Sequence, residues 1–564
     1  MEQRVSPSQG GALLDMTRVF YASCTKYDVL TRISVFEKEL GWEPIAVITS
    51  FTAKESVKKA YPTIPVYARD YFYSNVSPLS GEKILSTSLL EDIEFIQPFV
   101  TNIYAMMDRF AHPENFTTIE RRRYLRMLTY EWGAYLDEIA PDYVHFDETP
   151  HGTIGYIIYL LCKRRNIPTI WFRSTSFKNR ILLQDSIAEG PISLTRSLEE
   201  VNRTDFEYFF KSAQKQIDLL RQSDTFCHDY MLRQEKTALS PRTRVENEDA
   251  QQRVEAPQRR LINLLKVWKY PLYITNVIRG TIQNVKAKIC CKTVSTSAII
   301  DEPISEKMQQ NFQFPPTKNI SIMLSEYNAH FKARKEYKEE LFETYNAMTS
   351  DFDYFSEDYL FFPLHFQPER TTTPEAGVVS DQFIAIANLH NLLPEGWKLV
   401  VKEHPTEFNL RPYFATEIGR NANDYADFLS LSKVVLTDSS IPSSVLIRNS
   451  RATVTLTGTA GWESAINGVP GIHISPTWYQ GFPGTFFAPN YKDLKDAIAL
   501  ISEGGYQKTN PSRETEWLKK LYSSSFSFDA DIQSPLCPNT NSQEQIQGLT
   551  ASMESWLLHI TESL

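Results

Sequence analysis

The sequence lacks the patterns that mark several common protein classes. Its six cysteines form no C-x-x-C pair and no dense framework, and its ten histidines form no H-x-x-x-H pair, so neither a disulfide scaffold nor a zinc ribbon is expected. No run of about 18 apolar residues occurs, and the first twenty residues are polar where a secretory signal carries its apolar region. We therefore expect reduced thiols and a cytoplasmic protein that contacts a membrane only from its surface.

An excess of positive charge is also missing. The chain has 59 Lys and Arg residues against 68 Asp and Glu residues, a formal net charge of −9. Nucleic acid is therefore not expected as the main partner, because neutralising its phosphates requires a basic surface. What is present is a globular composition, with 42% hydrophobic and 23% charged residues over 564 positions, a length that predicts two or three domains.

The N-terminal part predicts strands that alternate with helices. Short apolar runs typical of buried strands are followed by segments with apolar residues at helical spacing. This alternation favours a parallel sheet with crossover helices, in a first Rossmann-like domain over residues 1–200. The expected strands are 18–24, 44–50, 143–147 and 169–173, and the expected helices are 27–40 and about 150–165.

The next segment, 201–315, has a different character and predicts a helical, partly basic insertion. Residues 200–250 are highly charged, and no acidic residue occurs between Ala256 and Ile300, while basic and apolar residues alternate over 256–292. Two interpretations remain open. The stretch is either a helix pair packed between the domains or a basic amphipathic segment that lies on anionic lipid, although Pro271 interrupts it.

A second α/β pattern covers residues 316–505, followed by a C-terminal tail and helix over 506–564 that either packs back or frays. Short strands with intervening helices again favour a doubly wound parallel sheet, in which ligands bind beyond the carboxyl ends of the strands. The fold class expected is therefore α/β, with two Rossmann-like doubly wound domains facing across a cleft and a helical insertion between them. The expected strands are 320–324, 359–363, 398–402, 433–437, 452–456 and 471–474, and the expected helices are 332–347, 380–392 and 462–467.

The first of four polar segments at strand ends carries two neighbouring acids, Asp147 and Glu148. Side chains alternate along a strand, so only one of the two is expected to face the cleft. Thr149 is expected to cap the following helix with Pro150 at its first position, which would place His151 in the first turn. A carboxylate near a histidine suits proton abstraction from a sugar hydroxyl, and a carboxylate can instead act as a nucleophile.

The second and third segments bring cationic and hydrogen-bonding side chains to strand ends. One follows the strand 359–363 and suits a carboxylate or phosphate oxygen. The other follows the strand 398–402, where Pro405 stops the strand. The candidate substrate-binding residues of these two segments are His365, Gln367, Glu369, Arg370, Lys402 and His404.

The fourth segment runs from a β-branched strand into Thr457-Gly458-Thr459 and then a short helix. Backbone N–H groups and threonine hydroxyls gather there in a way that can hold a phosphate. The lysine of the G-x-x-x-x-G-K-[ST] loop is absent, so this is not a P-loop. Glu463 would repel a phosphate placed directly beside it and fits better as an acceptor for ribose hydroxyls.

In order along the chain, the motifs PDYVHFDETPHGTIGYIIY, FFPLHFQPER, VVKEHP and VTLTGTAGWESAINGVPGI resemble those of the capsular polysaccharide biosynthesis proteins of Gram-negative bacteria. That family includes transferases that add Kdo (3-deoxy-D-manno-octulosonic acid) from CMP-Kdo to a surface glycan. The resemblance covers roughly residues 140–175 and 355–485. It implies a GT-B glycosyltransferase fold, two Rossmann-like domains facing across a cleft. The domain over 1–200 would then lie on the acceptor side, and the domain over 316–505 would bind the nucleotide sugar.

The resemblance also implies roles for the candidate residues. His404 and the turn 457–459 would hold the CMP phosphate, Glu463 would take the ribose, and Asp147 or Glu148 would be base or nucleophile. Candidates for the Kdo carboxylate are Lys402, His365 and Gln367. No metal or other cofactor is expected, since GT-B enzymes commonly work without one, no D-x-D stands in an obvious metal-binding loop, and the D-x-D spelling at 351–353 precedes its strand.

The sequence leaves other functions open. One alternative is a transferase that uses a UDP- or GDP-sugar, CMP-sialic acid or CDP-glycerol, and another is a non-catalytic polysaccharide export or scaffold protein with the same fold. The expected partners are a nucleotide-sugar donor and an oligosaccharide or glycolipid acceptor. The expected place is the cytoplasm, with peripheral contact at the inner face of the inner membrane through 256–292.

Overall fold

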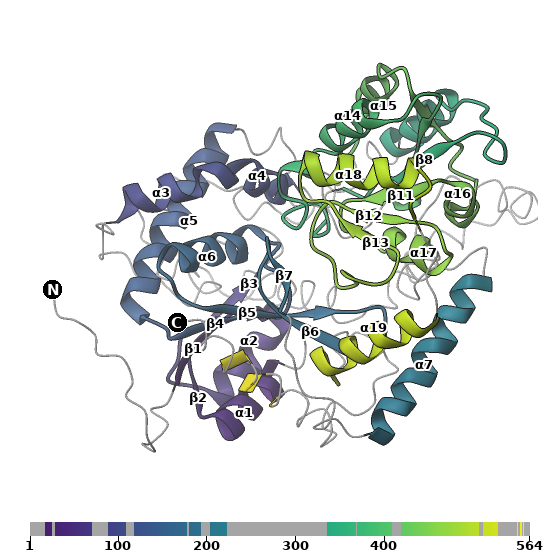
Figure 1. Cartoon of the computed structure of the whole chain (residues 1–564). Helices are drawn as coiled ribbons and strands as arrows, with labels where there is room; N and C mark the ends of the chain where they lie inside the picture. Colours follow the sequence, from purple (N-terminus) through teal and green to yellow (C-terminus); the bar gives the residue numbers. More distant parts are fainter. Residues whose placement is uncertain are drawn as a thin grey trace, which may run out of the picture.

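The computed structural model describes two α/β bodies joined side by side (Figure 1). The predictions for residues 223–335, including the basic stretch 256–292 and the strand 320–324, lie outside the described residues. The structure describes residues 17–24, 29–69, 88–108, 118–177, 180–192, 203–222, 336–367, 369–408, 419–506, 511–527, 550, 553–554 and 556–557.

The first sheet has the strand order β14-β6-β5-β4-β1-β2-β3, and β7 pairs with β6. The pairs among β1 to β5 are parallel, whereas β6 runs antiparallel to β5, β7 and β14. Counted along the chain, β1 to β6 therefore follow the order 3-2-1-4-5-6 of a doubly wound fold. The strands are β1 (Thr17–Cys24), β2 (Trp42–Ser50), β3 (Val66–Arg69), β4 (Tyr143–His145), β5 (Thr169–Ser174), β6 (Arg180–Ser186), β7 (Gly190–Pro191) and β14 (Phe526–Ser527).

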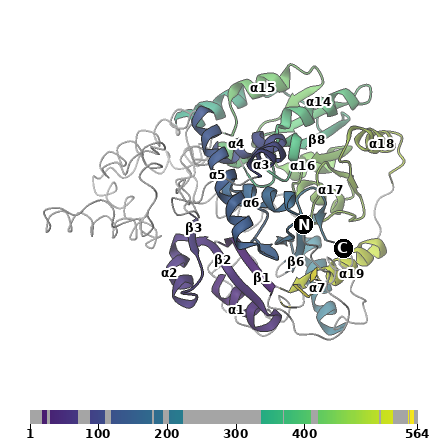
Figure 2. The ribbon, with the colours of Figure 1, turned by 90° about the vertical axis from the view of Figure 1, so that its left-hand side faces the viewer.

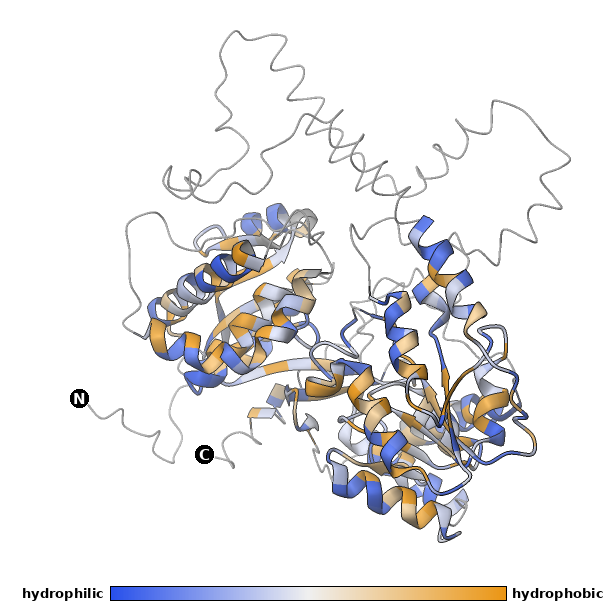
Figure 3. Ribbon diagram, turned by 90° about the horizontal axis from the view of Figure 1, so that it is seen from above, coloured by the Kyte–Doolittle hydropathy of each residue, from blue (hydrophilic) through white to orange (hydrophobic). Residues whose placement is uncertain are grey.

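Helices cover both faces of this sheet. On one face, α1 buries Val29, Ile33, Phe36 and Leu40, which recur at helical spacing, and Gly41 in the left-handed region (φ 68°) follows its end. Figure 3 shows the resulting mixture of hydrophobic and hydrophilic residues along the helices. The helices are α1 (Val29–Leu40) and α2 (Phe51–Ala60) on this face, and α3 (Leu89–Ile96), α4 (Val100–Asp108), α5 (Thr118–Ile139) and α6 (Thr153–Arg164) on the other.

The second sheet repeats the same order in parallel strands. Its order is β10-β9-β8-β11-β12-β13, again 3-2-1-4-5-6 when counted along the chain. Residues 336–347, α14, α15 and α18 supply the main apolar core. The elements are β8 (Tyr359–Pro363), α14 (Gln382–Leu392), β9 (Lys398–Lys402), α15 (Ala422–Leu429), β10 (Val434–Leu436), α16 (Ser443–Asn449), β11 (Ala452–Thr455), α17 (Ala460–Ile466), β12 (Gly471–His473), β13 (Thr485–Phe487) and α18 (Tyr491–Ser502).

The expected fold class, two Rossmann-like doubly wound domains, is confirmed. Strand β13 and the helices α15, α16 and α18 of the second domain were not predicted, nor were β3, β6, β7 and α2 to α5 of the first. In each sheet the strand order reverses beside the first strand, between β1 and β4 and between β8 and β11. Loops after these strands are where such folds bind ligands, so they define the regions to compare with the sequence candidates.

An apolar joint connects the two domains on one side. Helices α7 (Arg203–Gln222) and α19 (Pro511–Ser524) lie against each other and against α17 (Figures 1 and 2). Their buried side chains pack with Phe177 and Leu182 of the first domain and with Trp462 and Trp478 of the second. The chain then returns to the first sheet through β14, so its C-terminal part packs back. In the part of the chain that the structure describes, no helix is long and apolar enough to cross a membrane.

Candidate functional site

The loops after β4 and β5 of the first domain touch the segment that follows β8 in the second. Thr149 Oγ1 donates to Glu375 Oε1 at 2.9 Å, and Arg370 Nη1 donates to Glu148 Oε2 at 3.1 Å. Arg173, near the end of β5, also donates to Glu375. The carboxyl ends of strands from both sheets therefore meet at one place, which we call the domain junction.

The two neighbouring acids after β4 point to different surroundings. Asp147 is buried, and its Oδ1 accepts a hydrogen bond from Arg32 Nη1 of α1 at 2.5 Å. Glu148 is 31% exposed and pairs with Arg370 of the second domain. Both acids lie beyond the end of β4 at His145, so their directions are set by the loop and not by alternation along a strand, and Glu148 is the acid that faces the domain junction.

The helix after these acids begins later than the sequence suggested. We expected Thr149 to cap it, but α6 begins at Thr153 with Gly152 as its N-cap. The Thr149 hydroxyl is instead used by Glu375, and the His151 ring nitrogen Nδ1 lies 2.8 Å from the Thr149 carbonyl oxygen. The prediction that His151 sits in the first helical turn is wrong, because residues 149–152 form a loop at the domain junction and the helix begins only at Thr153.

Glu375 is the central carboxylate of the domain junction. Its Oε1 accepts from Thr149 and Arg173 and lies 3.2 Å from Arg370 Nε. Burial acts to raise the pKa of Glu375, but Arg173 and Arg370 outweigh it and hold the pKa below its usual value. A buried anion is thus compensated by one guanidinium group from each domain.

His365, directly beyond β8, supports the turn after β11. Its Nε2 accepts from the Thr457 backbone N–H at 3.4 Å and lies 3.3 Å from Thr455 Oγ1. Burial, with the positive fields of His404 and Arg420, lowers the pKa of His365 to about 3, so the ring is neutral near pH 7. The ring therefore acts as an acceptor beneath this turn.

In the turn 457–459, Thr457 is buried and the other two residues are half-buried, and hydrogen bonds to two neighbouring loops hold the turn. Thr457 Oγ1 donates to the Thr371 carbonyl at 2.8 Å, and Tyr479 donates to the Gly458 carbonyl at 2.6 Å. A Cβ atom on Gly458 would lie 2.8 Å from Thr455 Oγ1, so the close approach requires glycine. The turn is held in one conformation by both neighbouring loops.

Glu463 follows this turn in the first turn of α17. Thr459 donates to its Oε1 at 2.8 Å. Burial raises the pKa of Glu463, and the Thr459 hydrogen bond opposes that shift. The Thr459 hydroxyl is therefore engaged by Glu463 in this structure.

The end of β9 is braced within the second domain. Glu403 accepts from Arg420 and Tyr425, both at 2.9 Å, while Lys402 Nζ donates to the Ile441 carbonyl at 2.5 Å. His404 Nδ1 accepts from the Thr406 N–H at 3.2 Å. The structure thus places His404 near Phe366 and His365 at the strand ends, whereas Lys402 is directed to the segment before α16.

The remaining candidates of the FFPLHFQPER segment make local contacts. Gln367 donates to the Ser380 carbonyl at 2.5 Å, and its backbone N–H donates to Glu407. Glu369 Oε2 accepts from the Thr371 hydroxyl at 3.1 Å. Arg370 pairs with Glu148 across the junction, while Gln367 and Glu369 shape the loop that carries Arg370.

Sequence reasoning missed three charged residues that matter here. Arg32 lies on the buried face of an amphipathic helix, and Arg173 is a single charge near the end of an apolar strand. A charge at such an apolar position could have been recognised from the sequence as a buried, paired residue. Glu375 lies in an ordinary turn before α14, and nothing in the local sequence indicates that it is buried. Each is buried and forms an ion pair, which is the usual requirement for a charge inside a protein.

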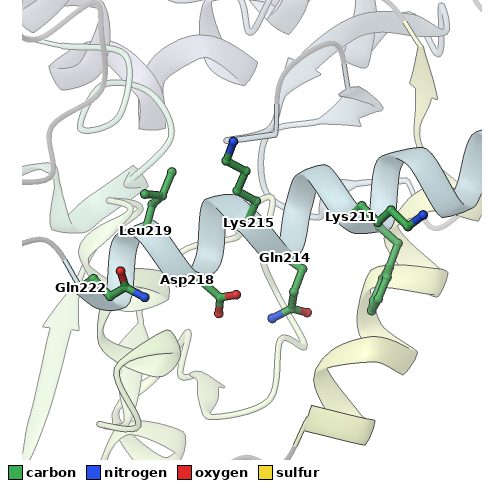
Figure 4. A pocket seen from close by; sticks show the side chains of 7 residues that line it. Lys211, Gln214, Lys215, Asp218, Leu219 and Gln222 are labelled. Atoms are coloured by element: carbon green, nitrogen blue, oxygen red, sulfur yellow. The ribbon is translucent and has the colours of Figure 1, made fainter.

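A hollow of about 470 Å³ lies elsewhere, along α7 (Figure 4). All of its lining residues come from this one helix, whereas ligand sites generally combine several elements. We therefore place no site there. Its lining residues are Phe210, Lys211, Gln214, Lys215, Asp218, Leu219 and Gln222. Among the described residues, no three His, Cys, Asp or Glu side chains gather closely enough to hold a metal ion.

Comparisons with known proteins add fold likenesses only. No family model and no curated protein matches the chain. A beta Kdo 2,7 transferase, KpsC of Thermosulfurimonas dismutans, is similar at 14% identity and a TM-score of 0.21, over 40% of this chain and 61% of that chain. The chain therefore spans less than two thirds of that solved structure.

Two further solved structures are similar over more of their length. The UDP-GlcNAc 2-epimerase from Methanocaldococcus jannaschii matches at 12% identity and a TM-score of 0.22, over 89% of this chain and 98% of that chain. The calicheamicin glycosyltransferase CalG4 matches at 12% identity and a TM-score of 0.19, over 97% of this chain and 100% of that chain. At these scores the likenesses carry no inference about activity.

Proposed function

We propose that this protein is a glycosyltransferase of bacterial surface polysaccharide biosynthesis, with a nucleotide-activated sugar as donor and a glycan or glycolipid as acceptor. The observation that carries the proposal is the domain junction, where loops at the carboxyl ends of two Rossmann-like sheets meet through Glu148 and Arg370. In open α/β sheets such loops bind nucleotides and their substrates. The sequence motifs that resemble Kdo transferases fall on these same loops.

The favoured donor is CMP-Kdo. The turn 457–459 is fixed by His365 and Tyr479. The Thr457 and Gly458 N–H groups donate to His365 Nε2 and Thr455 Oγ1, so the phosphate would be held by the Thr459 N–H and the N–H groups at the start of α17. His404 lies beside His365 at the end of β9 and is the second donor-binding candidate. These assignments extend the resemblance of the motifs to the positions that the fold brings together.

Glu148 is the proposed reacting carboxylate. It faces the domain junction, whereas Asp147 is buried against Arg32. Glu148 can take the proton of the acceptor hydroxyl as that oxygen attacks the anomeric carbon and CMP departs with the bonding electrons. Alternatively its own oxygen attacks that carbon and forms a glycosyl adduct that the acceptor then resolves.

Turnover of defined donors tests the proposal. Purified protein is incubated with CMP-Kdo, UDP-GlcNAc or GDP-mannose, and release of CMP, UDP or GDP is followed by chromatography. We expect CMP release from CMP-Kdo and its loss in Glu148→Gln, with the exposed Glu94→Gln as matched control. Release from a different donor would replace the donor assignment. No release from any donor, with polysaccharide output unaffected by Glu148→Gln in cells, would favour the export or scaffold alternative.

A further inference from the structure

Two arginines from different domains share one carboxylate oxygen at the domain junction. Arg173, near the end of β5, donates to Glu375 Oε1, and Arg370 Nε lies 3.2 Å from the same oxygen. The Arg173 side chain is 7% exposed, so its charge is almost fully removed from water. The proposed function gives neither Arg173 nor Glu375 a part in catalysis or in donor binding.

Glu375 uses only part of the binding capacity of this arginine pair. Its contacts with Arg173, Arg370 and Thr149 all fall on Oε1, while Oε2 is buried and has no hydrogen-bond partner within the described residues. A guanidinium group presents parallel N–H donors that match two oxygens of one oxyanion. An oxyanion that engages two oxygens therefore complements the pair better than Glu375 does.

The arginine pair lies beside the turn assigned to the donor. Thr371, the neighbour of Arg370, accepts a hydrogen bond from Thr457 Oγ1 at 2.8 Å. Arg173 interacts electrostatically with Tyr479, whose hydroxyl donates to the Gly458 carbonyl at 2.6 Å. The turn itself carries no lysine or arginine, so a positive charge for an anionic group must come from neighbouring loops.

We propose that Arg173 and Arg370 form a two-arginine oxyanion site across the domain junction, with Glu375 as an internal counter-ion that the ligand displaces. The inference rests on the proposed function, since it takes the ligand to be the nucleotide-sugar donor. The oxyanion is either the donor phosphate or the carboxylate of an acidic sugar. Because one arginine comes from each domain, ligand binding and contact between the domains are coupled.

Calorimetric titration of the full chain tests this site, with CMP, cytidine and free Kdo as probes. We expect Arg173→Met to weaken CMP binding by about 10- to 100-fold and cytidine binding by less than about twofold, as befits loss of a charge-assisted contact. The matched control is Arg451→Met, which removes a surface arginine 56% exposed and paired with Asp358. Loss of Kdo binding with unchanged CMP binding would assign the site to the sugar carboxylate.

Two further variants separate ligand binding from structure. Glu375→Gln removes the competing anion, so it should tighten CMP binding, whereas a purely structural link between the domains would loosen it. The double variant with Arg173→Met and Glu375→Gln removes both charges of the Arg173–Glu375 ion pair. It keeps the test valid if Arg173→Met alone misfolds because Glu375 is left buried without Arg173. Binding of CMP and Kdo that is equal in the double variant and in Glu375→Gln would overturn the site, as would weaker CMP binding in Glu375→Gln than in the wild type. If the wild type binds no CMP, UDP, GDP or Kdo, the proposed function fails first and this inference with it.

Discussion

Charged side chains at the carboxyl edges of the two sheets have different partners. At the edge of the second sheet, Glu403 and Glu407 are buried and paired within their own domain, with Arg420 and Lys338 respectively. At the edge of the first sheet, Glu148 and Arg173 reach across to the second domain. The second domain is thus braced internally and presents a fixed surface, and the first domain supplies groups that complete the junction.

The largest expected effect concerns the buried ion pair between Arg420 and Glu403 in the second domain, which we call the internal brace. Arg420→Met leaves Glu403 buried without its guanidinium partner, and such a loss typically costs about 3–5 kcal/mol of unfolding free energy. Urea denaturation followed by tryptophan fluorescence measures it. The double variant with Glu403→Gln should recover much of the loss. A change below about 1 kcal/mol for Arg420→Met would show that the brace is not a structural requirement.

The next effect separates the neighbouring acids of the first sheet. Glu148→Gln should lower turnover by about 100-fold or more. The unfolding free energy should change little, because the Glu148 side chain is 31% exposed. Donor turnover and urea denaturation are measured on the same preparations.

Asp147→Asn should show the opposite behaviour. It removes the charge that compensates buried Arg32, so the unfolding free energy should fall by about 3 kcal/mol while the folded fraction keeps most of its turnover. The same two assays apply. Equal losses of turnover in both variants would contradict the assignment of different surroundings to the two acids.

A smaller effect follows from the neutral ring of His365. With its pKa lowered to about 3 by burial, the folded protein does not bind the proton that the unfolded chain takes up below about pH 6.5. Stability is therefore complete above that pH and decreases as the pH falls toward 3. Between pH 7 and pH 5 the unfolding free energy should fall by about 2 kcal/mol because of His365.

Urea denaturation of wild type and His365→Gln at several pH values isolates the histidine. The glutamine variant should lose part of the pH dependence, whereas His390→Gln, outside the junction, should retain all of it. An unchanged slope in His365→Gln would mean that other groups cause the acid sensitivity.

The smallest effect expected on stability is at the turn after β11. A methyl group in Gly458→Ala meets Thr455 Oγ1 at 2.8 Å and His365 Nε2 at 3.1 Å, so the turn must shift, at a cost of about 1 kcal/mol or more. Nucleotide affinity should fall with it. Gly155→Ala, whose added Cβ has no neighbour closer than 3.5 Å, is the control. Equal nucleotide affinity in the two variants would argue against this turn as a binding element.

Much of the fold followed from local patterns in the sequence. Strands such as 359–363 and 398–402 were predicted at their observed bounds, because a buried parallel strand is a short continuous apolar run. Strand β13 was missed, since its three residues resemble a turn segment, and α6 was started too early because Thr149 resembles a helix cap.

From the sequence, the site could be predicted only to the level of which strand ends carry it. Loops at the carboxyl ends of β4, β8, β9 and β11 could be chosen from the sequence, because parallel strands bring those ends to one edge. The partners could not be chosen, since Glu375 and Arg173 are separated by 202 positions and meet only when the domains are placed together. That pairing depends on tertiary structure, which local patterns do not encode.

A crystal structure of the protein with CMP tests the central claim most directly. We predict that the phosphate lies at the domain junction, within hydrogen-bonding distance of the turn 457–459 and of a guanidinium group of Arg173 or Arg370. CMP bound away from this junction, for example along α7, would contradict the account.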